Sequence, residues 1–233
     1  MASVLVVAAH PDDEVLGCGG VIARLVAEGN QVYALYLTDG LGAREEGAIG
    51  AKETKNSLAL VKKRRDAAEK AASILGIKKC WYENFPDNAM DSAVFLDIVK
   101  AVESANAEVN ADAVYTHYFG DLNIDHQLTH RAVMTAFRPQ VDCSVKSIFS
   151  FEVLSSTEWS GPMTKEFLPQ YVVDISDFWD KKMEALTAYQ DEIKVSPHSR
   201  SYVAVEALAK LRGQTHGFQY AEAFYINRIL LPK

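Results

Sequence analysis

The stretch VLVVAAHPDDE, residues Val4–Glu14, decides the fold. It begins as an unbroken apolar run, typical of a strand that is buried on both faces of a parallel sheet, and it ends in His10, Pro11 and three acids. Proline suits the first turn of a helix, and carboxylates favour the positive end of a helix dipole. The stretch therefore predicts a strand–turn–helix unit whose turn carries one imidazole and three carboxylates.

The rest of the chain continues this alternation of strand-like and helix-like segments, which is the pattern of a parallel sheet with crossover helices. Before Ser155 we expect strands at Ser3–Ala9, Gln31–Leu37, Lys79–Tyr82, Ala113–Thr116 and Ser147–Glu152, with helices at Glu14–Glu28, Thr54–Leu75, Asp91–Ala105 and His126–Phe137. Beyond it we expect strands at Tyr171–Ile175 and Tyr220–Leu231 and helices at Phe178–Tyr189 and Val203–Arg212. The sequence thus predicts one α/β domain over residues 1–233, whose C-terminal extension wraps the main sheet.

Composition excludes several functional classes. The 233 residues are 48% hydrophobic and 24% charged, an ordinary mixture that can bury a substantial core. A formal charge of −7 opposes binding to nucleic acid or anionic lipid. No apolar stretch approaches the ~20 residues of a membrane span, MASVLVVAA lacks the basic flank of a signal peptide, and three cysteines without C-x-x-C spacing disfavour disulfides. We expect a cytoplasmic protein with no nucleic-acid partner and no membrane span.

The glycines of GCGG, residues 17–20, raise the alternative of a dinucleotide-binding fold. Asp39 even lies where a ribose-binding acid would be expected. However, Ile22 stands where the third glycine is required, and the acids of the preceding turn would repel pyrophosphate. We reject this alternative and expect the glycines to allow close packing of the first helix.

A metal site is a second possible function of the turn after the first strand. His10 and Asp13 lie three positions apart after a strand, and ligands bind at the carboxyl ends of strands in open α/β sheets. A third ligand has three candidates in the later segment HYFGDLNIDHQLTH, ranked His126, then His117, then His130. The competing interpretation is that the acids of the turn only cap the helix.

These residues resemble the PIG-L/LmbE-like zinc-dependent N-acetyl-sugar deacetylases. The resemblance rests on AHPDDE after the first strand and on the Asp-His pair at residues 125–126. It extends to ILG at 74–76, FPD at 85–87, GDLNIDH at 120–126 and RGQTHGFQYAEAF at 212–224. It implies a Rossmann-like three-layer sandwich with a mostly parallel central sheet.

The resemblance also implies a set of roles. Zinc would be bound by His10, Asp13 and His126, with Asp12 as the general base, and Arg64 and Asp87 would contact the substrate. A site of two histidines and one carboxylate also accepts Fe²⁺. Zinc would polarise an amide carbonyl and lower the pKa of its water, while Asp12 would take up the proton and return it to the amine.

Two further positions complete the expected site. Asp125 is expected to orient a neighbouring histidine or polar group. Asn123 departs from the H-x-D-H pattern that is frequent in the family, although its amide N–H₂ can still donate to an oxyanion. The alternative is that Asn123 only stabilises its turn.

The sequence therefore predicts a zinc-dependent hydrolase that removes acetyl from the nitrogen of a small-molecule N-acetyl sugar or sugar conjugate. Two alternatives stay open: an amidase acting on a different sugar-linked amide, and a non-catalytic sugar-binding member of the fold. The polar stretch PHSR, residues 197–200, is a candidate lid or subunit contact, and a homo-oligomer is compatible with the sequence.

Overall fold

The central element is a seven-stranded sheet with the strand order β3-β2-β1-β4-β5-β7-β6. A computed structural model describes residues 1–40, 55–161 and 165–231. The first five strands pair in parallel, while β7 is antiparallel to both β5 and β6. The strands are β1 (Ser3–Ala8), β2 (Gln31–Thr38), β3 (Lys79–Phe85), β4 (Ala113–His117), β5 (Ser147–Phe151), β6 (Tyr171–Asp174) and β7 (Ala221–Ile229).

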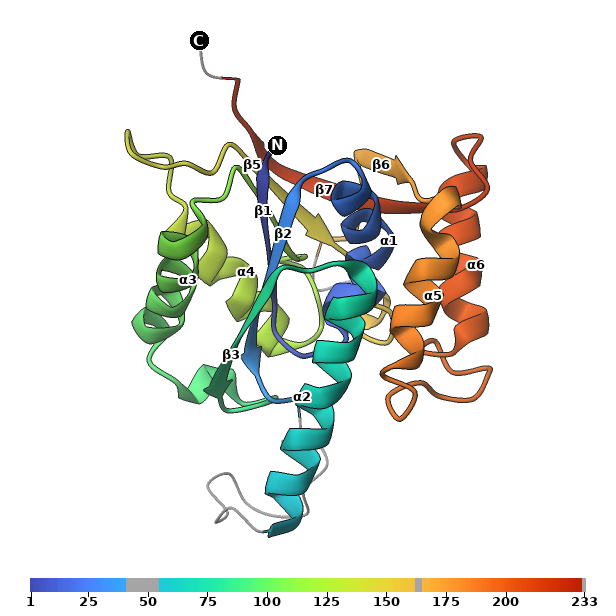
Figure 1. Ribbon diagram of the computed structural model, residues 1–233, viewed down its shortest axis with the longest axis horizontal. Coiled ribbons are helices and arrows are strands. Elements are labelled where there is room, and N and C mark those ends of the chain that lie inside the picture. Colours follow the sequence, from blue (N-terminus) through green and yellow to red (C-terminus); the bar gives the residue numbers. More distant parts are fainter. Residues whose placement is uncertain (41–54, 162–164, 232–233) are drawn as a thin grey trace.

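Helices cover both faces of this sheet and complete a three-layer α/β sandwich (Figure 1). One face packs against α1 (Asp13–Ala27), α2 (Lys55–Leu75), α5 (Trp179–Thr187) and α6 (Tyr202–Gln214). The other packs against α3 (Phe95–Val109) and α4 (Ile124–Ala136). The fold class expected from the sequence is confirmed, and no helix in the described ranges is long and apolar enough to cross a membrane.

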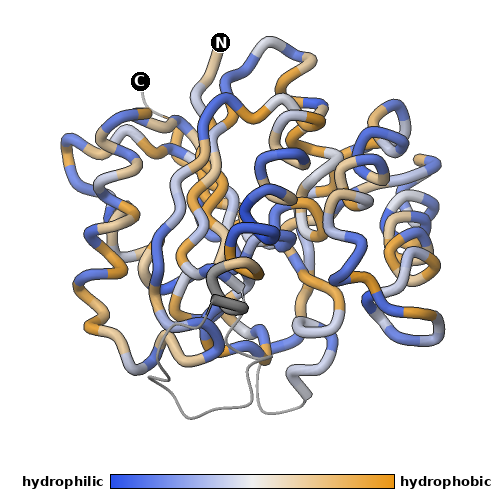
Figure 2. The backbone as a smooth tube through the Cα atoms, turned by 60° about the horizontal axis from the view of Figure 1, so that its bottom comes forward, coloured by the Kyte–Doolittle hydropathy of each residue, from blue (hydrophilic) through white to orange (hydrophobic). Residues whose placement is uncertain are grey.

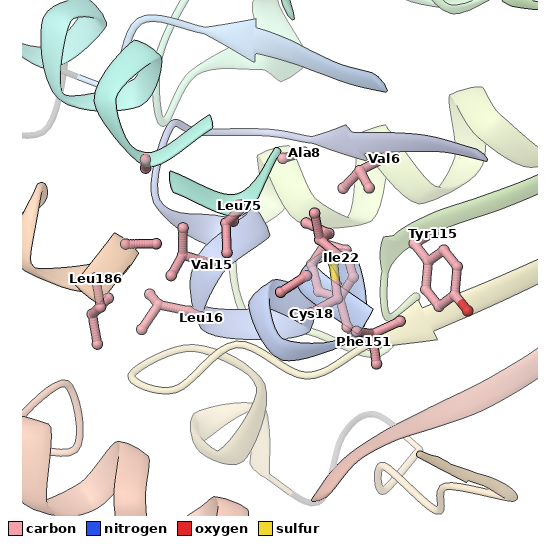
Figure 3. Packing of buried hydrophobic residues seen from close by; sticks show 14 of the residues in the cluster. Val6, Ala8, Val15, Leu16, Cys18, Ile22, Leu75, Tyr115, Phe151 and Leu186 are labelled. Carbon is pink, nitrogen blue, oxygen red and sulfur yellow. The ribbon is translucent and has the colours of Figure 1, made fainter. Parts of the chain in front are cut away.

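Two buried clusters explain why the strands are continuously apolar. Along β1, Val4 and Val6 face the cluster under α1, whereas Leu5 and Val7 face the cluster under α3 and α4. Figure 2 shows the resulting hydrophobic stretches along the central strands. Figure 3 shows the first cluster from close by, with Cys18 and Ile22 of α1 beside Phe151 of β5.

The glycines of residues 17–20 serve close packing, as predicted. A Cβ atom on Gly20 would lie 2.6 Å from Ile175, and one on Gly17 would clash with the ring of Phe151. Neither position leaves room for a side chain unless its neighbours move. The first helix therefore reaches the sheet and the C-terminal region only because these positions lack side chains.

The predicted segments differ from the structure mainly at their ends and in the C-terminal region. The helix expected at Asp91–Ala105 is a 3₁₀ turn, Met90–Ser92, followed by α3, because Ala93 and Val94 are extended. The expected start at Thr54 lies outside the described residues. The C-terminal extension covers one face of the sheet through α5 and α6, but it also adds β7 and β6 to the sheet edge.

Candidate active site

The turn between β1 and α1 is built around a strained residue. Asp12 has φ 116°, a backbone conformation that favours glycine, and its side chain makes no capping hydrogen bond to α1. The Oδ2 atom of Asp13 accepts a hydrogen bond from the backbone N–H of His10 at 2.9 Å. Helix capping therefore does not account for these two acids, although Glu14 does accept the N–H of Asp12 at 3.0 Å.

The three predicted metal ligands converge at the carboxyl ends of β1 and β4, which are neighbours in the sheet. Nδ1 of His10 lies 3.0 Å from Oδ2 of Asp13 and 3.2 Å from Nε2 of His126, which in turn lies 3.3 Å from Oδ2 of Asp13. A tetrahedral site with bonds of about 2.0–2.1 Å has edges of about 3.3–3.4 Å. The triangle thus has nearly the dimensions of one face of a zinc coordination shell.

The donor atoms suit a cation in two further respects. Oδ1 of Asp13 is buried and has no hydrogen-bond partner in the described part of the chain. Burial by itself lowers the pKa of His126, but the carboxylates of Asp121 and Asp13 outweigh burial and raise this pKa to about 9. Carboxylates likewise raise the pKa of His10 well above its usual value, against the effect of burial. The centre attracts positive charge, and a bound divalent cation would displace the protons.

Two carboxylates hold the outer nitrogen of His10. Its Nε2 lies 3.0 Å from Oδ1 of Asp87 and 3.1 Å from Oδ2 of Asp125. Asp125 is itself fixed by the backbone N–H groups of Asn88 and Met90, at 2.6 and 3.0 Å. An imidazole that donates from Nε2 leaves Nδ1 free to bind a metal.

This arrangement modifies two predictions. Asp125 does contact a histidine, but its partner is His10 from the first turn and not the adjacent His126. Asp87, expected to bind substrate, lines the pocket described below and also contacts His10 and the hydroxyl of Thr38. His10, Asp87 and Asp125 also place their ligand atoms close enough to form a second possible cation group.

Asp121 holds the outer ring nitrogen of His126, as Asp87 and Asp125 hold that of His10. Its Oδ1 lies 3.2 Å from Nδ1 of His126, and the hydroxyls of Ser156 and Thr157 donate to its two carboxylate oxygens. Burial by itself raises the pKa of Asp121, but His126 and these hydroxyls outweigh burial and lower this pKa to about 2. Sequence reasoning missed this residue, although it belongs to the quoted segment GDLNIDH.

The two lower-ranked histidines have other roles. Nε2 of His117 accepts the backbone N–H of Ala9 at 2.8 Å, and its ring stacks on His126 with centroids 3.9 Å apart. Nδ1 of His130 bonds the carbonyl of His117 at 2.9 Å. These contacts position the ring of His126 and the end of β4, although Nε2 of His117 also lies 3.4 Å from Oδ2 of Asp13.

Asp12 lies beside this centre and contacts two arginines. Nη2 of Arg64 is 3.4 Å and Nη1 of Arg200 is 3.2 Å from Oδ2 of Asp12. Oδ1 of Asp12 is buried and has no hydrogen-bond partner among the described residues. Arg64 also pairs with Glu192 and is buried, so it does not belong to a solvated basic face. Arg200, in the PHSR stretch, was not predicted to contact the site.

Both polar atoms of the Asn123 side chain form hydrogen bonds. Its Oδ1 caps α4 by accepting the N–H of Asp125 at 2.8 Å, and its Nδ2 donates to Oδ1 of Asn88 at 3.0 Å. These contacts match the alternative in which Asn123 stabilises its turn. The amide N–H₂ carries two donors, so one bond to Asn88 does not use its full capacity.

A pocket of ≈ 200 Å³ brings these groups together. This volume is below the ~300–1,000 Å³ typical of pockets that enclose a drug-sized ligand, so it suits a small group of a larger molecule. Predicted and unpredicted residues share its wall: His10, Asp12, Gly40, Arg64, Asp87, Asn88, Asn123, His126, Ser155, Ser156, Glu192 and Arg200.

The fold and the site define an α/β protein with a two-histidine, one-carboxylate centre at the carboxyl end of its parallel strands. Comparison with protein families makes this more specific. The model of the PIG-L family, described as GlcNAc-PI de-N-acetylase, matches residues 5–137, more than half of the chain. The chain belongs to this family, as its sequence motifs indicated.

Individual relatives agree with this assignment. The chain is 28% identical over 195 residues to the uncharacterized deacetylase YaiS of Escherichia coli, covering 80% of this chain and 90% of the relative. It is 26% identical over 228 residues to the diacetylchitobiose deacetylase of Thermococcus kodakarensis, covering 94% and 80%. The conserved protein TT1542 of Thermus thermophilus matches in structure with a TM-score of 0.73 and 27% identity, over 100% and 98% of the two chains.

One relative carries the name of a different reaction. The 4-oxalmesaconate hydratase of Pseudomonas putida is 27% identical over 197 residues, covering 79% of this chain and 71% of the relative. Family membership therefore does not by itself select hydrolysis of an amide.

Proposed function

We propose that this protein is a zinc-dependent N-deacetylase that hydrolyses the N-acetyl group of an amino sugar or sugar conjugate to acetate and a free amine. The triangle formed by Nδ1 of His10, Oδ2 of Asp13 and Nε2 of His126, with edges of 3.0–3.3 Å, is the observation that carries the proposal. Deacetylase relatives support the choice of reaction. Fe²⁺ could fill the same donor set.

Each residue of the site has a place in this reaction. His10, Asp13 and His126 would hold the metal, with Asp87, Asp125 and Asp121 fixing the two imidazole rings. When bound, the metal supplies polarisation of the amide carbonyl and a lower pKa for its water. Two neutral imidazoles and one carboxylate are a ligand set of catalytic zinc sites, which keep a position open for water or substrate.

Asp12 would move the proton. Its Oδ1 is unpartnered and buried in the pocket wall, while Arg64 and Arg200 occupy the other oxygen. This carboxylate can accept a proton from the attacking water and deliver it to the departing amine. Asn123 lines the same pocket and would donate to the carbonyl oxygen as negative charge grows there.

The decisive experiment is release of acetate from a panel of N-acetyl sugars, nucleotide sugars and N-acetyl disaccharides by zinc-loaded protein. We expect acetate and amine in equal amounts, and loss of both after His126→Ala. Sugars that carry a different N-acyl group would be assayed beside this panel, and release of amine from them alone would indicate another sugar-linked amide. Saturable sugar binding without any turnover would indicate a non-catalytic member. Absence of acetate together with hydration of an unsaturated dicarboxylic acid would refute the proposal in favour of a hydratase.

A further inference from the structure

Helix α1 is interrupted at Cys18, which has the non-helical angles φ −150° and ψ 23°. In a continuous helix the N–H of Gly20 would donate to the carbonyl of Leu16. Here the N–H of Gly20 donates to Oε1 of Glu222 at 3.0 Å, and the carbonyl of Leu16 accepts from Nζ of Lys182 at 3.0 Å. Two charged side chains from the C-terminal third of the protein thus take the place of one helical hydrogen bond.

These two side chains form a buried ion pair. Nζ of Lys182 lies 2.6 Å from Oε1 of Glu222, and the side chains are only 4% and 5% exposed. The second oxygen of Glu222 accepts the N–H of Val21 at 2.7 Å. Buried ion pairs contribute little to stability compared with apolar residues of similar volume, because both charges lose their hydration. Stability alone is therefore a weak explanation for this pair.

The GCGG segment provides the space for the pair and its supporting elements. A Cβ atom on Gly19 would lie 3.4 Å from Cγ of Lys182, and one on Gly20 would lie 2.6 Å from Ile175. A side chain at Gly20 would therefore push the segment before α5 away from the break, whereas Gly19 lies in ordinary contact distance of Lys182. The glycines that resemble a nucleotide-binding loop in the sequence therefore make room for a polar insertion into the helix.

The break at Cys18 lies five positions after the candidate metal ligand Asp13, in the same helix. The first part of α1 is a short piece that begins with Asp13 and follows the strained Asp12. Tyr189, just after α5, holds the start of this piece by donating to Oε1 of Glu14 at 2.7 Å, while Oε2 of Glu14 accepts the N–H of Asp12. Lys182 holds its end through Leu16. A strained backbone persists only where its surroundings hold it in place.

We propose that the Lys182–Glu222 pair in the break of α1, together with Tyr189, is a positioning device that holds Asp12 and Asp13 in the geometry required for metal binding and proton transfer. The proposal rests on the proposed function, because it concerns the same metal centre. None of the three residues is expected to touch metal or substrate. Their effect is transmitted through the backbone of residues 12–17.

The test uses the full chain with Co²⁺ as the probe, because its visible absorption spectrum reports the geometry of its ligands. The main variant is Lys182→Met with Glu222→Gln, which removes both charges and avoids an unpaired buried charge. Tyr189→Phe is the second variant, since it removes one hydroxyl and keeps the ring. The control is Arg228→Met on the same strand as Glu222, because Arg228 bonds the carbonyls of Phe137 and Val145 away from α1.

We expect the double variant to raise the dissociation constant for Co²⁺ by at least about tenfold, as substitutions behind metal ligands commonly do, and to change the spectrum. Tyr189→Phe should change both in the same direction, and Arg228→Met should change neither beyond about twofold. In metal-free protein, hydrogen exchange of residues 13–17 should accelerate in the double variant and not in the control.

Unchanged Co²⁺ affinity, spectrum and hydrogen exchange in Tyr189→Phe and in the double variant would overturn the proposal. If the double variant does not fold, Tyr189→Phe alone decides. If wild-type protein binds no Co²⁺, the proposed function fails, and hydrogen exchange still decides whether these residues hold the turn.

Discussion

The substitution Asp121→Asn tests the part of the site that sequence reasoning missed. Oδ1 of Asp121 lies 3.2 Å from Nδ1 of His126, so the carboxylate keeps the proton on Nδ1 and leaves Nε2 available at the metal centre. Asparagine has the same shape and retains an acceptor for the hydroxyls of Ser156 or Thr157, but it carries no charge. The variant should fold normally and bind zinc more weakly.

The expected size of this effect follows from the contacts. Loss of a partner behind a metal ligand costs about 10–100-fold in affinity, or about 1.4–2.7 kcal/mol. Because asparagine keeps the acceptor, we expect a loss near the lower end for Asp121→Asn. Asp121→Ala removes the acceptor as well and leaves buried donors unpaired, so we expect the upper end, together with a loss of stability of about 1–3 kcal/mol.

Zinc affinity would be measured by competition with a chromophoric chelator, and stability by denaturant unfolding of metal-free protein. Asp112→Asn is the matched control, because Asp112 accepts the N–H of Ser3 at the amino ends of β1 and β4, opposite to the site. If Asp121→Asn binds zinc within about twofold of wild type, Asp121 does not tune His126 and the reasoning is wrong.

Three further predictions concern catalysis. Asp12→Asn should retain zinc, measured by elemental analysis, but lose about 10²–10⁴-fold in kcat; a near-wild-type rate would exclude Asp12 as the base. Asn123→Ala should lower kcat by about 10²–10³-fold and stability by about 1 kcal/mol, because it removes both the donor and the helix cap. Asn123→Asp keeps the cap without the donor, so it should lower kcat alone. If the alanine variant loses only stability, Asn123 acts as a helix cap and not as a donor to substrate. Arg64→Ala and Asp87→Ala should lower kcat/KM on the true substrate, and Asp87→Ala should also weaken zinc binding through His10; unchanged values for both variants would contradict these roles.

Much of the candidate site could be predicted because it depends on local sequence. The apolar run of β1 ends at His10, and parallel neighbouring strands bring their carboxyl ends together, so a ligand after β1 and another after β4 must lie close to each other. The Asp-Asp-Glu turn and the Asp-His pair at the start of α4 therefore indicated His10, Asp13 and His126 correctly as neighbours.

The contacts that were missed depend on the register and packing of distant elements. Arg200 meets Asp12 across 188 positions, and Glu222 meets Gly20 across 202. No periodicity or spacing encodes such pairs, since they depend on how α5 and α6 pack and on how β7 pairs within the sheet. Asp125 contacts His10 and not the adjacent His126, because the backbone N–H groups of Asn88 and Met90 hold its carboxylate there.

The position of β7 has a consequence for how the protein is synthesised. Among the described strands β7 is the last in the chain, yet it lies inside the sheet, between β5 and β6. As a nascent chain leaves the ribosome, β6 emerges before the strand with which it pairs, so it must wait for residues 221–229. The N–H groups of Gly20 and Val21, made early, likewise wait for Glu222. A chain whose translation stops before residue 221 would contain every predicted metal ligand and none of the β7 contacts, which makes it a substrate for chaperones and proteases.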